Sequence, residues 1–484
     1  MRLSSIMKAL SAVFLLATVS VAQSGPPSST WLSRLAQGQN LEHRGRFTEA
    51  EDLVTQLINE ADSLDAKPPE FGEALAVLGT IYQDLAHYDK AEGVFRRAVE
   101  WQEKTNPNAT ASAVALSNLG NCLVLEEKYS AALPLFNRAA EILKQPAVNN
   151  ATDLSIVLFS TAFLYRETNQ DSQAEDLYRQ SIQVAEKAEP FDRHMVANAL
   201  SKFAAFLNTR GRFSEAESSY KRALQVLETG SKADSADLAA LVNNLGEVYF
   251  KQERWDEAES LYRRSLKLSQ EDPESKPWEP ATAEFNLARL YAQTGKFSEA
   301  NSYFLSAEQH FKAAVGPMHP AFASVIFVEG DYYRRRGYYQ KAQPLLSEAA
   351  EIFGRAQPDS LNLAAAQISL AQADLARGNV TDADQLCRNG LNIRTRTLGS
   401  EHRETLQAEQ TLGEILRIER QYLEAELLYV HAIKGFESRT TDRAYLQIAL
   451  DQYAALLQSM GRKAEAKQIQ MRLKTVSRTA FVAQ

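Results

Sequence analysis

The chain has 484 residues and a formal net charge of -8, from 53 basic and 61 acidic residues. That acidic balance argues against a dedicated nucleic-acid-binding protein, which usually carries a basic surplus. The sequence has only two cysteines, Cys122 and Cys387, so a disulfide framework and a four-cysteine zinc module are excluded. With 45% apolar and 24% charged residues, the composition is ordinary for a soluble globular protein.

The N-terminal segment, residues 1–22, has the pattern of a secretory signal peptide. A basic start at Arg2 and Lys8 leads into an uncharged run over residues 9–22 that ends with the small residues Ser20 and Ala22. The run is shorter than the roughly 20 residues that a bilayer span needs. We therefore expect cleavage at this point and an exported bacterial protein, periplasmic or secreted. The alternative is an uncleaved membrane anchor.

The rest of the chain is a repeat array. One phrase recurs, consisting of an aromatic residue, a spacer, a polar residue and alanine, often followed by glutamate. Successive copies of this alanine are 41 or 42 residues apart, which chance does not produce. The eleven alanines are Ala50, Ala91, Ala132, Ala174, Ala216, Ala258, Ala300, Ala342, Ala383, Ala425 and Ala466.

Each repeat is predicted to be a pair of helices. A small residue lies twelve positions before each alanine and a bulky one usually lies four after it, as Gly246 and Tyr262 flank Ala258. Steps of three, four and seven between such positions indicate helices, and glycines such as Gly211 predict the turn between them. The small residue allows the two helices to approach closely. We predict an all-α array over residues 31–484, after a linker at 23–30, closing with a polar helix at about 467–478.

The order of small residue, aromatic, alanine, aromatic and alanine resembles the tetratricopeptide repeat, over about residues 30 to 480. The junctions at 315–320 (VGPMHP) and 398–402 (LGSEH) resemble the longer repeats of kinesin light chains and their bacterial relatives. This resemblance implies a right-handed α-solenoid of about eleven repeats, whose first helices line a concave groove that binds peptides or partner helices. It also leaves open a cytoplasmic kinesin light chain-like adaptor, if the N-terminal segment is not a signal.

The family pattern maps groove-facing positions to the first helix of each repeat, around the small residue. Asparagine there can hydrogen-bond both groups of an extended backbone, and lysine can meet a carboxylate. The alternative is that these polar residues only keep a wetted helix face soluble. The candidate partner-binding residues are Asn118, Asn121, Lys202, Asn208, Asn244, Asn286, Arg289 and Arg334.

The sequence contains no recognisable catalytic or metal-binding motif. It lacks a phosphate-binding glycine loop, an HExxH helix and a GxSxG elbow. None of its seven histidines has a second histidine or a cysteine at metal-ligand spacing on a helix. Both cysteines fall at core positions of the repeat. We therefore expect no catalytic residue, no metal and no cofactor.

The favoured function is a non-catalytic, exported scaffold that binds a protein or extended peptide in its groove. We expect no nucleic-acid partner and no membrane span after signal cleavage. One rival is a structural solenoid that self-associates through its ends or faces. The other is an enzyme hidden in the solenoid, for which the sequence offers no candidate site.

Overall fold

The computed structural model describes residues 30–64, 66–145, 148, 150–229, 235–272, 278–439 and 442–481. Over these residues the chain forms 22 helices and no strand, which confirms the predicted all-α class. The predicted signal at 1–22, and the linker up to residue 29, lie outside the described residues. The described chain divides into two compact units, residues 30–319 and 320–481, which we call the first and second unit.

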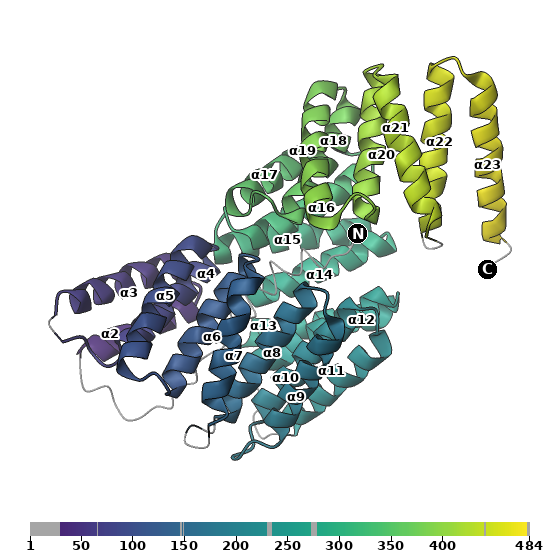
Figure 1. Ribbon diagram of the computed structural model, residues 1–484. Helices are drawn as coiled ribbons and strands as arrows, with labels where there is room; N and C mark the ends of the chain where they lie inside the picture. The colour runs from purple at the N-terminus through teal and green to yellow at the C-terminus, as the bar shows by residue number, and fades with distance from the viewer. Residues whose placement is uncertain are drawn as a thin grey trace. The chain divides into compact units, whose positions relative to one another are not determined.

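The first unit holds seven helix pairs, coloured purple to teal in Figure 1. They are α2 (Thr30–His43) with α3 (Phe47–Asp62), α4 (Phe71–Asp84) with α5 (Tyr88–Thr105), α6 (Thr110–Leu125) with α7 (Tyr129–Leu143), α8 (Ala151–Glu167) with α9 (Asp171–Glu186), α10 (Arg193–Thr209) with α11 (Phe213–Glu228), α12 (Ser235–Lys251) with α13 (Trp255–Glu271), and α14 (Trp278–Thr294) with α15 (Phe297–Val315).

The second unit holds four pairs, coloured green to yellow. They are α16 (Pro320–Arg335) with α17 (Tyr339–Ala356), α18 (Leu361–Arg377) with α19 (Val380–Leu398), α20 (Arg403–Ile418) with α21 (Tyr422–Glu437), and α22 (Arg443–Ser459) with α23 (Lys463–Phe481). Each predicted repeat is thus one helix pair. The segment expected as a closing helix, 467–478, lies inside α23, the second helix of the eleventh pair.

The small residue of each repeat marks the closest approach of its two helices. A Cβ atom added at Gly79 would lie 2.4 Å from the Phe95 ring, and one at Gly246 would lie 2.8 Å from the Tyr262 ring. Real Cβ atoms do not come so close, so the bulky residue of the second helix fills the space that glycine leaves. The predicted pairing of small and bulky positions is confirmed, and these contacts hold each pair together.

A residue in the left-handed backbone conformation follows the first helix of every pair. Glycine takes this position in six pairs, for example Gly211 with a φ of 75° and Gly295 with a φ of 79°. The other five pairs place a non-glycine residue there at φ between 57° and 63°: Ala86, Glu127, Asn169, Glu253 and Arg420. The turn geometry is therefore uniform although glycine marks it in only part of the array.

The first helices line the inner side of each unit's curve. Helices α4, α6, α8, α10, α12 and α14 each contact the first helix of the preceding pair, and within the second unit so do α18, α20 and α22. No second helix of the described chain makes comparable contact with the next second helix. Because only the first helices approach one another, they form the concave face of the stack.

The first unit also contains contacts between distant repeats. The Phe47 ring, at the start of α3, stacks on the Trp278 ring of α14 with centroids 6.0 Å apart, and both side chains are buried. His319 is buried as well, in a hydrogen bond with the backbone of Asp84, and burial lowers its pKa to about 4. The first two pairs are therefore held against the last pair of this unit.

Both cysteines are buried and unbonded to each other, as their core positions predicted. Burial raises the pKa of Cys387 to about 12, which keeps the thiol protonated at neutral pH. Within the described ranges, no cluster of metal-ligating side chains occurs. The described helices also include none that is both long and apolar enough to cross a membrane.

Candidate functional site

Seven of the eight candidate residues lie on first helices of the first unit. Asn118 and Asn121 belong to α6, Lys202 and Asn208 to α10, Asn244 to α12, and Asn286 and Arg289 to α14. The structure therefore places these seven candidates on helices that line the concave face, and four of their side chains, those of Asn121, Asn208, Asn286 and Arg289, are buried. Arg334 lies on α16 in the second unit, where its guanidinium donates to Asp331 at 2.8 and 3.0 Å.

The two candidates on α14 belong to a buried polar network that joins α12 to α14. Asn286 Nδ2 donates to Asn243 Oδ1 at 2.9 Å, and Arg289 donates to Asn286 Oδ1 at 2.9 Å. Arg289 also donates to Glu247 Oε2 at 3.1 Å, and the Tyr262 hydroxyl donates to the same oxygen at 3.0 Å. The side chains of Asn286 and Arg289 therefore already serve to hold neighbouring repeats in register.

The α8–α10 part of the concave face is aromatic and cationic. Lys202 Nζ lies 5.6 Å from the centre of the Phe159 ring, and the Arg166 guanidinium lies 4.0 Å from the Phe163 ring. Arg166 also pairs with Glu167 at 2.8 Å. Burial, with a smaller contribution from the positive charge of Arg166, lowers the pKa of Lys202 to about 8. Burial thus makes the charged form of Lys202 less stable than that of an exposed lysine, and a carboxylate nearby would stabilise it.

A second lysine on the same face is in a similar situation. Burial lowers the pKa of Lys251, at the end of α12, although Glu247 opposes the shift. Arg289 adds to the lowering through its positive charge. Lys202 and Lys251 therefore make this part of the concave face receptive to negative charge.

The asparagine candidates outside the α12–α14 network offer hydrogen-bonding groups. The side chains of Asn118, Asn121 and Asn244 form no hydrogen bond with the described chain, and Asn208 Oδ1 is buried without a partner. An asparagine amide presents a donor and an acceptor together, which matches the N–H and C=O of an extended peptide. Asn121 and Asn208 are buried, whereas Asn118 and Asn244 are half-buried, so Asn118 and Asn244 are the amides best placed to receive a backbone.

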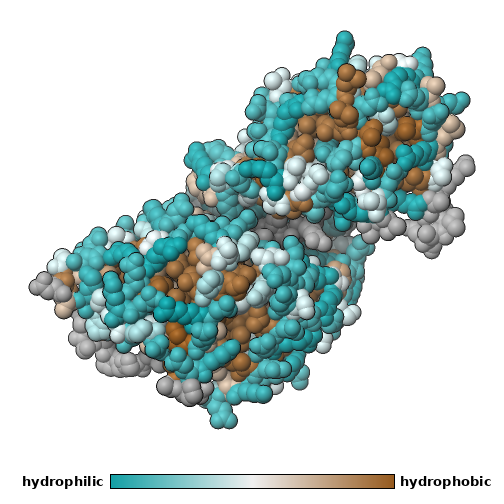
Figure 2. Space-filling view, viewed as in Figure 1, coloured by the Kyte–Doolittle hydropathy of each residue, from teal (hydrophilic) through white to brown (hydrophobic). Residues whose placement is uncertain are grey.

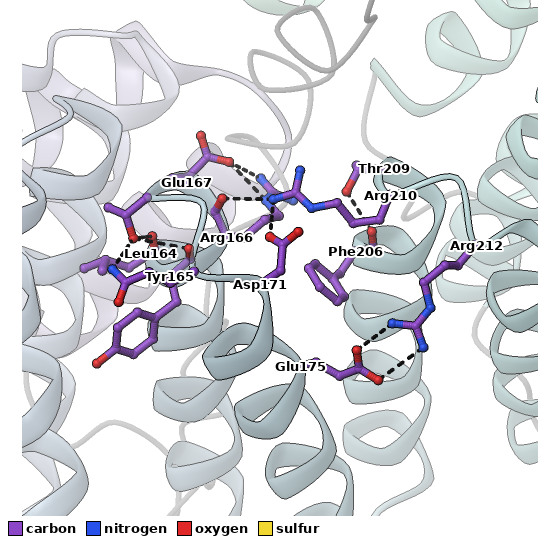
Figure 3. Close-up of polar contacts among 12 residues, drawn as sticks. Leu164, Tyr165, Arg166, Glu167, Asp171, Glu175, Phe206, Thr209, Arg210 and Arg212 are labelled. Carbon is purple, nitrogen blue, oxygen red and sulfur yellow. Dashed lines mark hydrogen bonds and ion pairs between the residues drawn. The ribbon is translucent and has the colours of Figure 1, made fainter. Parts of the chain in front are cut away.

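Polar contacts at the inter-helix turns hold the α8–α9 pair against the turn that follows α10. Arg210 donates to the backbone oxygen of Arg166 at 3.1 Å and pairs with Asp171, and Arg212 pairs with Glu175 at 2.5 Å (Figure 3). These contacts join residues 37 to 44 positions apart, which is one repeat. They hold these two neighbouring helix pairs in register.

The glutamate that follows the alanine of the repeated phrase is the centre of a recurring junction. Glu217 accepts from the Tyr249 hydroxyl at 3.0 Å and from Arg254 at 2.9 Å, both in the next repeat. Glu259 accepts in the same way from the next tyrosine, Tyr291, at 2.7 Å. The sequence showed this glutamate but not its partner, although a basic residue four positions before the next alanine was a usable signal.

Sequence reasoning missed two buried residues that contact the candidates, Asn243 and Phe159. Glu247 and Arg289 occupy equivalent positions 42 residues apart and carry opposite charges. That pairing could have been inferred from the period alone. Phe159 could not, because an apolar residue on a first helix looks the same whether it faces the core or the groove.

A scan against protein-family models matches a tetratricopeptide repeat model at residues 70–145, 195–271, 237–313 and 362–438. These stretches cover more than half of the chain. The chain belongs to the tetratricopeptide repeat family. This confirms the family that the repeat pattern resembled, and with it the helix-pair solenoid. A comparison with curated protein sequences finds no match.

The chain is also similar to solved structures at low sequence identity. A signal transduction ATPase with a tetratricopeptide repeat sensor, from Pyrococcus horikoshii, is 13% identical, with 77% of this chain and 54% of that chain covered and a TM-score of 0.50. The Rap protein complexed with Competence and Sporulation Factor is 14% identical, covering 76% and 98%, with a TM-score of 0.49. A protein assigned as a kinesin light chain, from Podosopora anserina, is 22% identical, covering 42% and 97%, with a TM-score of 0.38.

Proposed function

We propose that this protein is a non-catalytic, exported scaffold that holds an extended, acidic segment of a partner protein on the concave face of its first unit. The observation that carries this proposal is the pair of half-buried asparagine amides on α6 and α12, Asn118 and Asn244, that lack hydrogen-bond partners in the described chain. Such groups suit the backbone of an extended segment, which offers donors and acceptors at regular intervals. Lys202 and Lys251 add the preference for acidic side chains.

Export rests on the signal pattern at residues 1–22. N-terminal sequencing of the protein recovered outside the cytoplasm should begin at or near Gln23. Recovery of chains that start at Met1 in the soluble cytoplasmic fraction would contradict export. It would favour the cytoplasmic adaptor instead.

The binding proposal is tested by selecting decapeptides from a random displayed library against the purified chain. We expect the selected peptides to be enriched in Asp and Glu. The double variant Lys202→Ala with Asn244→Ala should bind them about 30- to 140-fold more weakly, because one charged and one neutral hydrogen bond together contribute about 2–3 kcal/mol.

The matched control is the double variant Lys267→Ala with Asn137→Ala, which removes the same groups from exposed positions of the second helices α13 and α7. It should bind the selected peptides like the unmodified chain, and circular dichroism should show both variants equally helical. Full affinity in the Lys202 and Asn244 variant would show that these residues only keep the face soluble. Failure to select any peptide would contradict the scaffold role itself.

A further inference from the structure

The second helix of the tenth pair, α21, carries an exposed apolar stripe. Leu423 is 76% exposed, Leu427 is 72% exposed and Val430 is 48% exposed. Steps of four and three residues put these side chains on one face of the helix. In Figure 2, hydrophobic residues also gather over the region of α18 to α21 on the visible face of the second unit.

The other repeats show that this stripe is not part of the fold. Leu423 and Leu427 lie two residues before and two residues after the alanine of the repeat, at outward positions of the second helix. All ten other copies place a polar or small residue at both positions: Thr48 and Asp52, Asp89 and Gly93, Ser130 and Pro134, Ser172 and Asp176, Ser214 and Ser218, Asp256 and Ser260, Ser298 and Ser302, Gln340 and Pro344, Thr381 and Gln385, and Ala464 and Gln468.

Packing within the repeat therefore does not require leucine at either position. Two large side chains exposed to this extent cost solvation free energy in the isolated chain. Their exposure is explained if another surface covers them. The chemistry around the stripe indicates what that surface is.

An ion pair of one acidic and one basic residue lies on each side of the stripe. Arg388 of α19 pairs with Glu424 at 2.8 Å, and Arg462, just before α23, pairs with Glu426 at 2.7 Å. Lys434, exposed, lies farther along α21. A border that is neutral overall does not select a strongly acidic or basic partner. It is compatible with its own copy, because each copy offers both a carboxylate and a cation.

We propose that α21 of one copy packs antiparallel against α21 of a second copy, across a two-fold axis. Such an interface is self-complementary, with Leu423 of one copy opposite Val430 of the other and the two Leu427 side chains adjacent to the axis. One helix face buries little area, so the dimer is weak and forms at high concentration. This surface is distinct from the concave face of the first unit.

Sedimentation velocity of the full chain, from about 5 to about 200 µM, tests the proposal at the concentrations where weak interfaces of this size associate. The sedimentation coefficient should rise with concentration. The variant Leu423→Glu with Leu427→Glu should weaken association at least about 10-fold, because it buries like charges against each other. The control Leu305→Glu changes a leucine of α15 that is 54% exposed and stands alone, and it should associate like the unmodified chain.

A second measurement does not require the folded chain to accept glutamate on α21. The Leu427→Cys chain should form a disulfide-linked dimer on mild oxidation, whereas Leu305→Cys should not. A chain that stays monomeric across the whole concentration range would overturn the proposal. So would a dimer that survives both glutamates, or equal crosslinking of the two cysteine variants.

Discussion

Glu217 is the residue on which two neighbouring repeats converge. It is 19% exposed and accepts from Tyr249, Arg254 and Lys221. Changing Glu217 to Gln removes its charge from this junction and should lower the local free energy of opening across α11 and α12 by about 1–2 kcal/mol. Hydrogen exchange of residues 213–251 measures this change.

The matched control is Glu257→Gln. Glu257 pairs with the same arginine, Arg254, but it is 50% exposed and lies within the same repeat as Arg254. Surface pairs of this kind contribute about 0–1 kcal/mol. Equal effects of the two substitutions would show that the ion pair between repeats contributes no more to stability than the pair within one repeat.

Lys202 gives the binding reaction a pH dependence. Its pKa is lowered to about 8 by burial, with Arg166 the charged group that adds to the shift. A carboxylate ligand binds the protonated lysine, so affinity for the selected acidic peptides should be highest below pH 8. It should fall as the pH rises through about 8 to 9, where Lys202 of the protein without peptide loses its proton.

The variant Lys202→Arg separates this lysine from other titrating groups. Arginine stays charged throughout this range, so the decline in affinity above pH 8 should disappear in the variant. Affinity is measured by fluorescence anisotropy at constant ionic strength. A decline of the same size in the arginine variant would assign the titration to another group.

For the candidate site, the sequence predicted the helix and the position of each residue but not its contacts. The 42-residue period correctly put Lys202, Asn244 and Asn286 on successive first helices. It did not show that Asn286 turns toward Asn243 and Arg289, because a period fixes the helix and the position but not the rotamer or the neighbour. The hydrogen bonds that occupy the side chains of Asn286 and Arg289 depend on atomic distances between repeats, which the sequence does not give.

At the scale of helices, two glycines should respond in opposite ways to the same substitution. Gly390 lies inside α19, where an added Cβ would be 2.8 Å from Ile368 and 2.9 Å from the backbone oxygen of Ala364. Gly93 lies inside α5 with nothing within 4 Å of its added Cβ. Alanine favours a helix over glycine by about 1 kcal/mol.

Gly93→Ala should therefore stabilise the chain by about 0.5–1 kcal/mol. Gly390→Ala should destabilise it by about 1–3 kcal/mol, because backbone cannot yield to the new methyl group. Thermal unfolding followed by circular dichroism gives the direction of each change. Stabilisation by both substitutions would mean that α18 and α19 can move apart freely.

The helix pairs themselves were the most predictable part of the molecule. Small and bulky positions at fixed spacing specify each close approach, as Gly246 and Tyr262 do, so eleven pairs follow from the sequence. The turns were predicted only where glycine marks them. Glu253 has a φ of 60°, and nothing in a glutamate residue signals that conformation, which the neighbouring helices impose.

At the scale of the whole molecule, the division into two units was not predictable. The period runs unbroken from Ala300 to Ala342, so spacing does not mark the boundary after residue 319. The contact between Phe47 and Trp278 within the first unit could not be predicted from the sequence either. It joins residues 231 positions apart, and its existence depends on the accumulated curvature of the intervening pairs.

Trp278→Ala tests whether that distant contact holds the first unit together. Truncating a buried tryptophan costs about 3–5 kcal/mol, and the loss should appear as faster hydrogen exchange both in α14 and in α3. The control is Trp101→Ala, which removes an edge contact to Phe71 in the same helix pair. Its effect should stay within α4 and α5. Unchanged exchange in α3 after Trp278→Ala would contradict the contact.

The most direct test of binding on the concave face is hydrogen exchange of the full chain with and without a selected acidic peptide. The proposed function predicts protection of the first helices α10 and α12, residues 193–209 and 235–251. The second helices α11 and α13 should remain unchanged. Protection confined to α11 and α13, or to the second unit at residues 320–481, would contradict binding at the concave face.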